Sequence, residues 1–174
     1  MTTYTTDLHL FSLGLLLARV VIGLLMAAHG AQKLLGWFGG YGLGATGEFM
    51  VQLGFRQGRA FATAASLTEV ASGLLVAFGF LGPVGPALML SVMIVAAITV
   101  HWQHGLFAAQ NGIEVPLLYG VVAFALAMTG FGEYSLDAWL GIAGRVPTVA
   151  TLIVLAGGIA GAFGNLALRQ KSRV

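Results

Sequence analysis

The sequence contains no cysteine, and charged residues make up only 8% of its 174 positions. Without cysteine the chain forms no disulfide, performs no thiol redox chemistry and holds no iron–sulfur cluster. A soluble domain carries about 25% charged residues, because its surface must be hydrated. The shortage of charge therefore excludes an ordinary water-soluble domain. The formal net charge of +2, without interleaved basic and aromatic residues, argues against nucleic acid as a partner.

Long apolar runs take the place of the missing charge. Hydrophobic residues make up 58% of the chain, and the mean hydropathy is +0.92. A helix that crosses the bilayer needs about 20 apolar residues. We expect spans of about this length at residues 12–36, 60–81, 84–101, 116–131 and 148–168. The sequence thus predicts an all-α membrane protein, with a four-helix transmembrane bundle core plus a C-terminal fifth transmembrane helix.

Charge distribution orients the predicted bundle. With five spans, the first connection and the C-terminus lie on the same side, and basic residues gather on both: Lys33, Arg56, Arg59, Arg169, Lys171 and Arg173. Because cytoplasmic loops are enriched in Lys and Arg, we expect a multi-pass protein of the cell membrane with its N-terminus outside. Residues 1–11 would form a short extracytoplasmic segment and residues 12–137 the four-helix core. Residues 138–174 would supply a connecting loop, the fifth helix and a basic cytoplasmic tail.

Ionisable residues occur inside these apolar runs, where a charge is costly and commonly functional. His29 and Lys33 share one face of the first helix, and Glu69 lies in the middle of the second. At about 1.5 Å per residue, His29 and Glu69 reach a similar depth. His101 ends the third helix and Glu114 begins the fourth on the same side. These five residues are the candidate ligand, quinone or proton site, and none is assigned a catalytic role.

A second polar group is predicted toward the outer side. Its candidates are Arg19 in the first helix and Glu133, Tyr134 and Asp137 after the fourth.

Simpler interpretations stay open for the same residues. Lys33 could extend its ammonium group to the interface, and His101 and Glu114 could be ordinary loop residues. Glu69 needs a partner, for which Lys33 or His29 is the natural choice, and the result could be a purely structural ion pair. A haem with one histidine ligand is an open alternative, although His29 and His101 differ in depth. His101 and His104 lack the usual spacing of zinc ligands, and we assign no metal site.

Two glycine patterns point to packing or turns. Residues 42–47 match G-x-G-x-x-G, but the pattern does not join a strand to a helix, so we expect a flexible interhelical loop instead of a nucleotide site. Residues 157–161 contain G-x-x-x-G in an apolar helix, a pattern typical of close helix packing. The fifth helix could therefore pack against its own bundle or mediate a homo-oligomer.

An ordered set of short motifs resembles the DoxX family of small bacterial and archaeal membrane proteins. The resemblance covers residues 12–137, and the fifth helix extends beyond the usual four. It rests on Arg19 with His29-Gly30-Ala31-Gln32-Lys33-Leu34, Glu69 with Gly73-Leu74-Leu75, Met93-Ile94-Val95-Ala96 with His101, Glu114-Val115-Pro116, and Gly130-Phe131-Gly132-Glu133-Tyr134-Ser135-Leu136-Asp137.

The family resemblance implies a subunit or partner of a quinone-linked oxidoreductase system. A quinone is then the expected cofactor, held at the polar site between helices, and a redox protein is the expected partner within the bilayer. If the chain is enzymatic, it would be a quinone-linked oxidoreductase subunit. The alternatives are a non-enzymatic membrane scaffold or assembly factor, and a small-molecule permease, for which the sequence shows no obvious inverted repeat.

Overall fold

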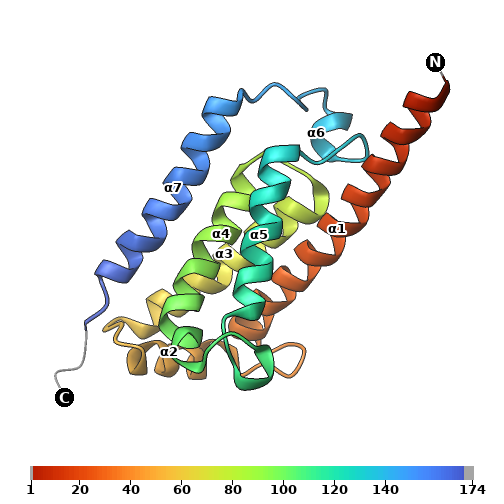
Figure 1. Cartoon of the computed structure of the whole chain (residues 1–174). Coiled ribbons are helices and arrows are strands. Elements are labelled where there is room, and N and C mark those ends of the chain that lie inside the picture. Colours follow the sequence, from red (N-terminus) through yellow and green to blue (C-terminus); the bar gives the residue numbers. More distant parts are fainter. Residues whose placement is uncertain (1, 171–174) are drawn as a thin grey trace.

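The computed structural model describes the backbone of residues 2–170 and the side chains of residues 7–170. Within these residues the chain is entirely helical, as predicted. Figure 1 shows long helices packed side by side, with a short helix at each end of the bundle. The helices are α1 (Thr2–Leu35), α2 (Gly42–Gln52), α3 (Gly58–Phe78), α4 (Val84–Ala96), α5 (Glu114–Thr129), α6 (Leu136–Trp139) and α7 (Thr148–Ala167). The tail residues Lys171 and Arg173 lie outside the described part of the chain.

Four helical segments are long and apolar enough to cross a membrane: Asp7–Leu35, Gly58–Phe78, Val84–His104 and Thr148–Ala167. The third includes a π-helical turn, η1 (Ala97–His101), and a short 3-10 turn, η2 (Trp102–His104), that prolong α4. Helix α5 has 16 residues, about 24 Å at 1.5 Å per residue. It is shorter than the roughly 30 Å hydrocarbon layer, yet Figure 1 shows it running from the α2 end of the bundle to the α6 end.

Two parts of the backbone differ from the prediction. The first helix begins at Thr2 instead of near residue 12. The glycine-rich segment 42–47 is not a flexible loop but the first half of α2. A Cβ added at Gly58 would lie 2.1 Å from the carbonyl oxygen of Gly47, so α2 packs directly on the start of α3. This packing outweighs the low helix propensity of glycine that favoured a loop.

Helices α1 and α3 approach each other through small residues. A Cβ added at Gly23 would lie 2.5 Å from the carbonyl oxygen of Gly73, and one at Gly30 would lie 2.6 Å from that of Ser66. Such contacts let two backbones come close inside a membrane. The register is antiparallel, since Gly30 faces the 66–70 turn and Gly23 faces the 73–77 turn. It therefore places His29 and Glu69 at a similar level.

Helix α7 packs on its own bundle. A Cβ added at Gly158 would lie 2.5 Å from the carbonyl oxygen of Ala87 in α4, whereas one at Gly157 would meet nothing within 4 Å. At the other end of α7, the backbone N–H of Gln170 donates to the carbonyl of Gly54 over 2.9 Å. Of the two packing partners that the sequence allowed for this helix, the structure contains the intramolecular one. A homo-oligomer through α7 stays a prediction.

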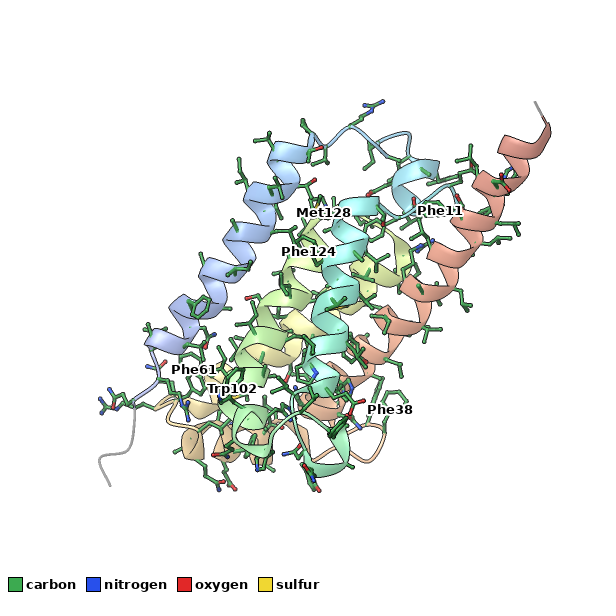
Figure 2. The ribbon with its side chains drawn as sticks, in the orientation of Figure 1. Phe11, Phe38, Phe61, Trp102, Phe124 and Met128 are labelled. Carbon is green, nitrogen blue, oxygen red and sulfur yellow. The ribbon has the colours of Figure 1, made fainter. Side chains whose placement is uncertain are left out.

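The surface of the bundle is apolar along its length. Large side chains such as Leu17, Val149 and Ile153 are exposed for about two thirds of their area, at 68%, 67% and 66%. Tryptophans mark the two ends, with Trp102 at the α2 end (Figure 2) and Trp139 in α6. An apolar belt between tryptophan-bearing ends is the surface expected of a protein surrounded by lipid.

Candidate functional site

Lys33 and Glu69 form an ion pair between α1 and α3. The ammonium group of Lys33 donates a hydrogen bond to Oε1 of Glu69. The Glu69 side chain is 1% exposed, whereas that of Lys33 is 36% exposed. A buried carboxylate without a cation would be strongly destabilising in this apolar setting. Lys33 is thus the ion-pair partner that Glu69 needs, and its partly exposed side chain approaches from the side of the bundle.

The second oxygen of Glu69 has no partner among the described residues. Oε2 is buried and accepts no hydrogen bond from any described residue. The nearby hydroxyls of Ser66 and Ser72 are buried too, but each donates to a backbone carbonyl of its own helix, over 2.7 Å and 3.2 Å. Buried carboxylate oxygens are normally hydrogen-bonded. Oε2 is therefore an acceptor available to a proton or to a ligand that donates a hydrogen bond.

His29 presents its ring toward α5. Its Nδ1 lies 3.2 Å from Oε1 of Gln32, whose own amide nitrogen donates to the carbonyl of Phe38 over 3.1 Å. That amide orientation makes Nδ1 the donor, so Nε2 of the neutral ring is an acceptor. The imidazole is exposed and meets the ring of Tyr119 edge-on, with centroids 6.0 Å apart. His29 thus lies beside the Lys33–Glu69 pair without bonding to it.

Tyr119 is a member of the site that the sequence reasoning missed. It is 6% exposed in α5, and its ring is the one that meets the imidazole of His29. Its hydroxyl makes no hydrogen bond to any residue between 7 and 170. The hydroxyl is therefore available to a ligand that accepts a hydrogen bond. The sequence feature that could have revealed it is that Tyr119 is a single tyrosine in the apolar run after Glu114, about one and a half helical turns beyond it.

His101 and Glu114 serve the loop at the α2 end. Nδ1 of His101 lies 2.8 Å from the carbonyl oxygen of Asn111, and Oε2 of Glu114 accepts from the backbone N–H of Ala108 over 2.7 Å. His104 bonds to the carbonyl of Val100 over 3.0 Å. Over residues 7–170, none of the three bonds to Lys33 or Glu69. The structure brings together two of the five predicted site residues as a bonded pair, with His29 adjacent.

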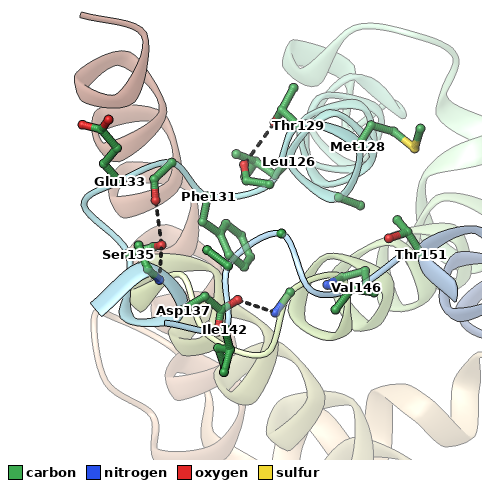
Figure 3. Close-up of a pocket in the computed structure, with 18 of the residues that line it drawn as sticks. Leu126, Met128, Thr129, Phe131, Glu133, Ser135, Asp137, Ile142, Val146 and Thr151 are labelled. Carbon is green, nitrogen blue, oxygen red and sulfur yellow. Dashed lines mark hydrogen bonds between the residues drawn. The ribbon is translucent and has the colours of Figure 1, made fainter. Parts of the chain in front are cut away.

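The Arg19 group lies at the α6 end. Arg19 is 2% exposed, and its guanidinium donates to the backbone carbonyls of Ala77, near the end of α3, and of Tyr134. Asp137 is also buried and accepts from the backbone N–H groups of Leu81 and Gly82, over 2.9 Å and 2.7 Å. Figure 3 draws the second of these bonds. Both side chains satisfy backbone groups at the α3–α4 turn, which makes them structural ties.

Glu133 and Tyr134 join this group differently. The carboxylate of Glu133 lies 3.0 Å from Nδ1 of His9, and both side chains are more than half exposed. His9 had been assigned only to the N-terminal segment, and the extension of α1 to Thr2 explains its position. Tyr134 takes part through its backbone carbonyl, while its hydroxyl lies 3.4 Å from the same nitrogen of His9. In the described chain Arg19 forms no ion pair with either acid.

Comparison with known proteins gives one match. A family model described as DoxX matches residues 14–102, which run from α1 to the end of α4 and contain Arg19, His29, Lys33 and Glu69. No curated protein and no solved structure matches the chain. The matched segment covers half of the sequence and includes both helices that carry the ion pair. This integral membrane protein, a bundle of apolar helices in which the buried Glu69 is paired with Lys33, belongs to the DoxX family.

Proposed function

We propose that the protein is a subunit or partner of a quinone-linked oxidoreductase system, with the quinone head group bound beside Lys33 and Glu69. The observation that carries the proposal is the buried, unpartnered Oε2 of Glu69, next to a lysine that is partly accessible. A buried ionisable pair that is incompletely satisfied is more typical of a ligand or proton site than of a packing contact.

The side chains of Lys33, Glu69, His29 and Tyr119 have the chemistry to bind a quinone head group. A quinone carbonyl accepts hydrogen bonds, which Lys33 and the hydroxyl of Tyr119 can donate. Reduction by two electrons requires two protons, and a quinol hydroxyl donates a hydrogen bond that Oε2 of Glu69 can accept. The imidazole of His29 is exposed, so it can carry protons between this site and the outside of the bundle. The electrons would come from a redox partner protein in or at the membrane.

We propose that the α2 end faces the cytoplasm and that the membrane is the cell membrane. Lys33, Arg56, Arg59 and Arg169 belong to the α2 end, whereas Arg145 belongs to the loop between α6 and α7. This asymmetry follows the enrichment of Lys and Arg in cytoplasmic loops. Protons for the Lys33–Glu69 site would then be exchanged on the cytoplasmic side.

A scaffold or assembly factor for a redox partner is the second candidate. Arg19 and Asp137 favour this function, because both side chains bond to backbone groups and act as structural ties. In a scaffold, the Lys33–Glu69 pair would likewise be structural. A stable co-purified redox protein, retained with a His29→Ala variant, would support this function. A permease is a weaker alternative, and proteoliposome flux measurements would test it.

Ligand extraction from protein purified in a mild detergent tests the main proposal. We expect a quinone by mass spectrometry in the wild-type extract and much less in that of Glu69→Gln. Glu48→Gln is the matched control, since Glu48 is an exposed residue of α2. An optical spectrum of the same preparation detects haem or flavin. Wild-type protein that carries no quinone and binds none when it is added would contradict the proposal.

A further inference from the structure

A cavity of about 440 Å³ lies at the α6 end, far along the bundle from Lys33 and Glu69. It is bounded by the last turn of α5, the loop from Gly130 to Ser135, the segment after α6 and the first turn of α7 (Figure 3). Only two of its lining residues, Gly82 and Pro83, fall within the segment that matches the DoxX family model. The cavity is therefore built mainly by the C-terminal part of this chain.

Thr151 supplies a hydroxyl to this cavity. The side chain is 7% exposed, and Figure 3 shows its oxygen turned toward the enclosed space. Five other helical threonines, Thr46, Thr63, Thr68, Thr99 and Thr129, each donate to the carbonyl four residues earlier. Between residues 7 and 170, the hydroxyl of Thr151 makes no such bond. The hydroxyl thus faces the cavity from a side chain that is otherwise buried, and it is available to a ligand there.

The first turn of α7 adds backbone donors at the same place. Its N-cap is Pro147, which makes no side-chain cap. The N–H groups of Thr148, Val149 and Ala150 consequently lack intrahelical acceptors, and Thr148 lines the cavity together with Thr151. Thr148, with its free backbone N–H, and the hydroxyl of Thr151 thus both border the cavity, and together they can donate to a strong acceptor.

The charge and the lining of the cavity limit the class of ligand that it can bind. Asp137 and Glu133 line the cavity, so an anion would meet two carboxylates of its own sign. Leu126, Phe131, Ile142 and Val146 make much of the wall apolar. We propose that this cavity binds a neutral amphipathic molecule through a carbonyl group, with the carbonyl oxygen accepting from Thr151 and the α7 N-terminus. In a membrane, the ester of a phospholipid and the ring of a quinone both supply such a carbonyl.

Trp139 in α6 allows the proposal to be tested at the right end of the bundle. It is 81% exposed and follows Ala138, which lines the cavity. Replacing Trp37 and Trp102 by Phe leaves Trp139 as the single tryptophan. Its fluorescence would be titrated with a short-chain ubiquinone in nanodiscs of diether phosphatidylcholine, which offers no ester carbonyl. The same titration in diester nanodiscs distinguishes the two sources.

We expect saturable quenching of Trp139 in diether nanodiscs, with affinity lowered about five- to ten-fold by Thr151→Val, the loss of one hydrogen bond. Thr129→Val is the matched control, because Thr129 also lines the cavity but its hydroxyl already bonds to Ala125. Weaker quinone binding in diester nanodiscs would identify the lipid ester as a competing ligand of the same site. Absence of saturable quenching in diether nanodiscs, or equal affinity for wild type and Thr151→Val, would overturn the proposal.

Discussion

The ammonium group of Lys33 bonds to one oxygen of Glu69, and the other oxygen of that carboxyl is buried without a partner. The pair joins α1 to α3, at a level where His29 and Tyr119 complete a polar face toward α5. Because the two charges of the ion pair cancel, the unused acceptor can bind a neutral hydrogen-bond donor without leaving a net charge in the membrane.

Removing Lys33 is expected to be more damaging than removing the whole pair. Lys33→Met leaves Glu69 buried without its cation, at a cost of about 3–5 kcal/mol in the free energy of unfolding. Adding Glu69→Gln to this variant removes the charge and should recover most of the loss. Thermal unfolding in detergent, followed by size-exclusion chromatography, measures both. Equal stability of the single and double variants would show that the pair does not compensate a buried charge.

Glycine positions in α1 should differ sharply in their tolerance of alanine. Gly30→Ala forces a Cβ against the backbone of α3, and we expect a loss of about 1–3 kcal/mol in stability. Gly14→Ala is the control on the same helix, because a Cβ there meets nothing within 4 Å. It should be neutral or stabilise by up to about 1 kcal/mol through helix propensity. A similar effect of both changes on the unfolding temperature would refute the close α1–α3 contact.

Arg19 is expected to hold the segment that contains α6. Arg19→Met leaves the carbonyls of Ala77 and Tyr134 without their donor, which costs about 1–3 kcal/mol. Arg19→Lys should restore little, since an ammonium group lacks the planar fork that reaches both carbonyls. Hydrogen exchange of residues 130–147 should accelerate in both variants and stay unchanged in Arg145→Gln, an exposed control. Unchanged exchange in Arg19→Met would rule out this role.

Single cysteines can determine the orientation, because the natural chain has none. Glu48→Cys places a thiol on exposed α2, and Arg145→Cys places one at the other end of the bundle. With α2 at the cytoplasmic face, a membrane-impermeant maleimide should label Arg145→Cys in intact cells and Glu48→Cys only after lysis. The reverse pattern would place the α2 end outside.

The sequence was sufficient to predict the helical membrane fold and the approximate position of each long helix. Apolar runs of this length have few other structural solutions. It also predicted a similar depth for His29 and Glu69, because both positions follow from the helical rise. Loops and glycine-rich segments were harder to predict. Helix α2 forms because Gly47 and Gly58 allow close packing between α2 and α3, a tertiary contact that local helix propensity does not reflect.

Side-chain pairing was predictable only in part. Lys33 was a natural partner for Glu69, but the choice between Lys33 and His29 depended on how α1 is rotated against α3. His101 and Glu114 were predicted as site residues because their positions along the helices place them at a suitable depth in the membrane. Sequence position does not give the direction in which a side chain points. Their bonds to the 101–114 loop arise from the π-helical and 3-10 turns that end the third span. Tyr119 was missed because a tyrosine in an apolar helix resembles an interfacial anchor.

The most direct test of the account is the affinity of a short-chain quinone for the Lys33–Glu69 site. A background with both Trp102→Phe and Trp139→Phe keeps Trp37 as the single tryptophan, at the α2 end and four residues beyond Lys33. We predict saturable quenching of this tryptophan, with affinity at least about ten-fold weaker in Glu69→Gln, the effect of losing a charge-assisted hydrogen bond. Glu48→Gln should match the parent protein. Quenching that does not saturate, or equal affinity in Glu69→Gln and its parent, would contradict the claim that Glu69 forms part of a quinone site.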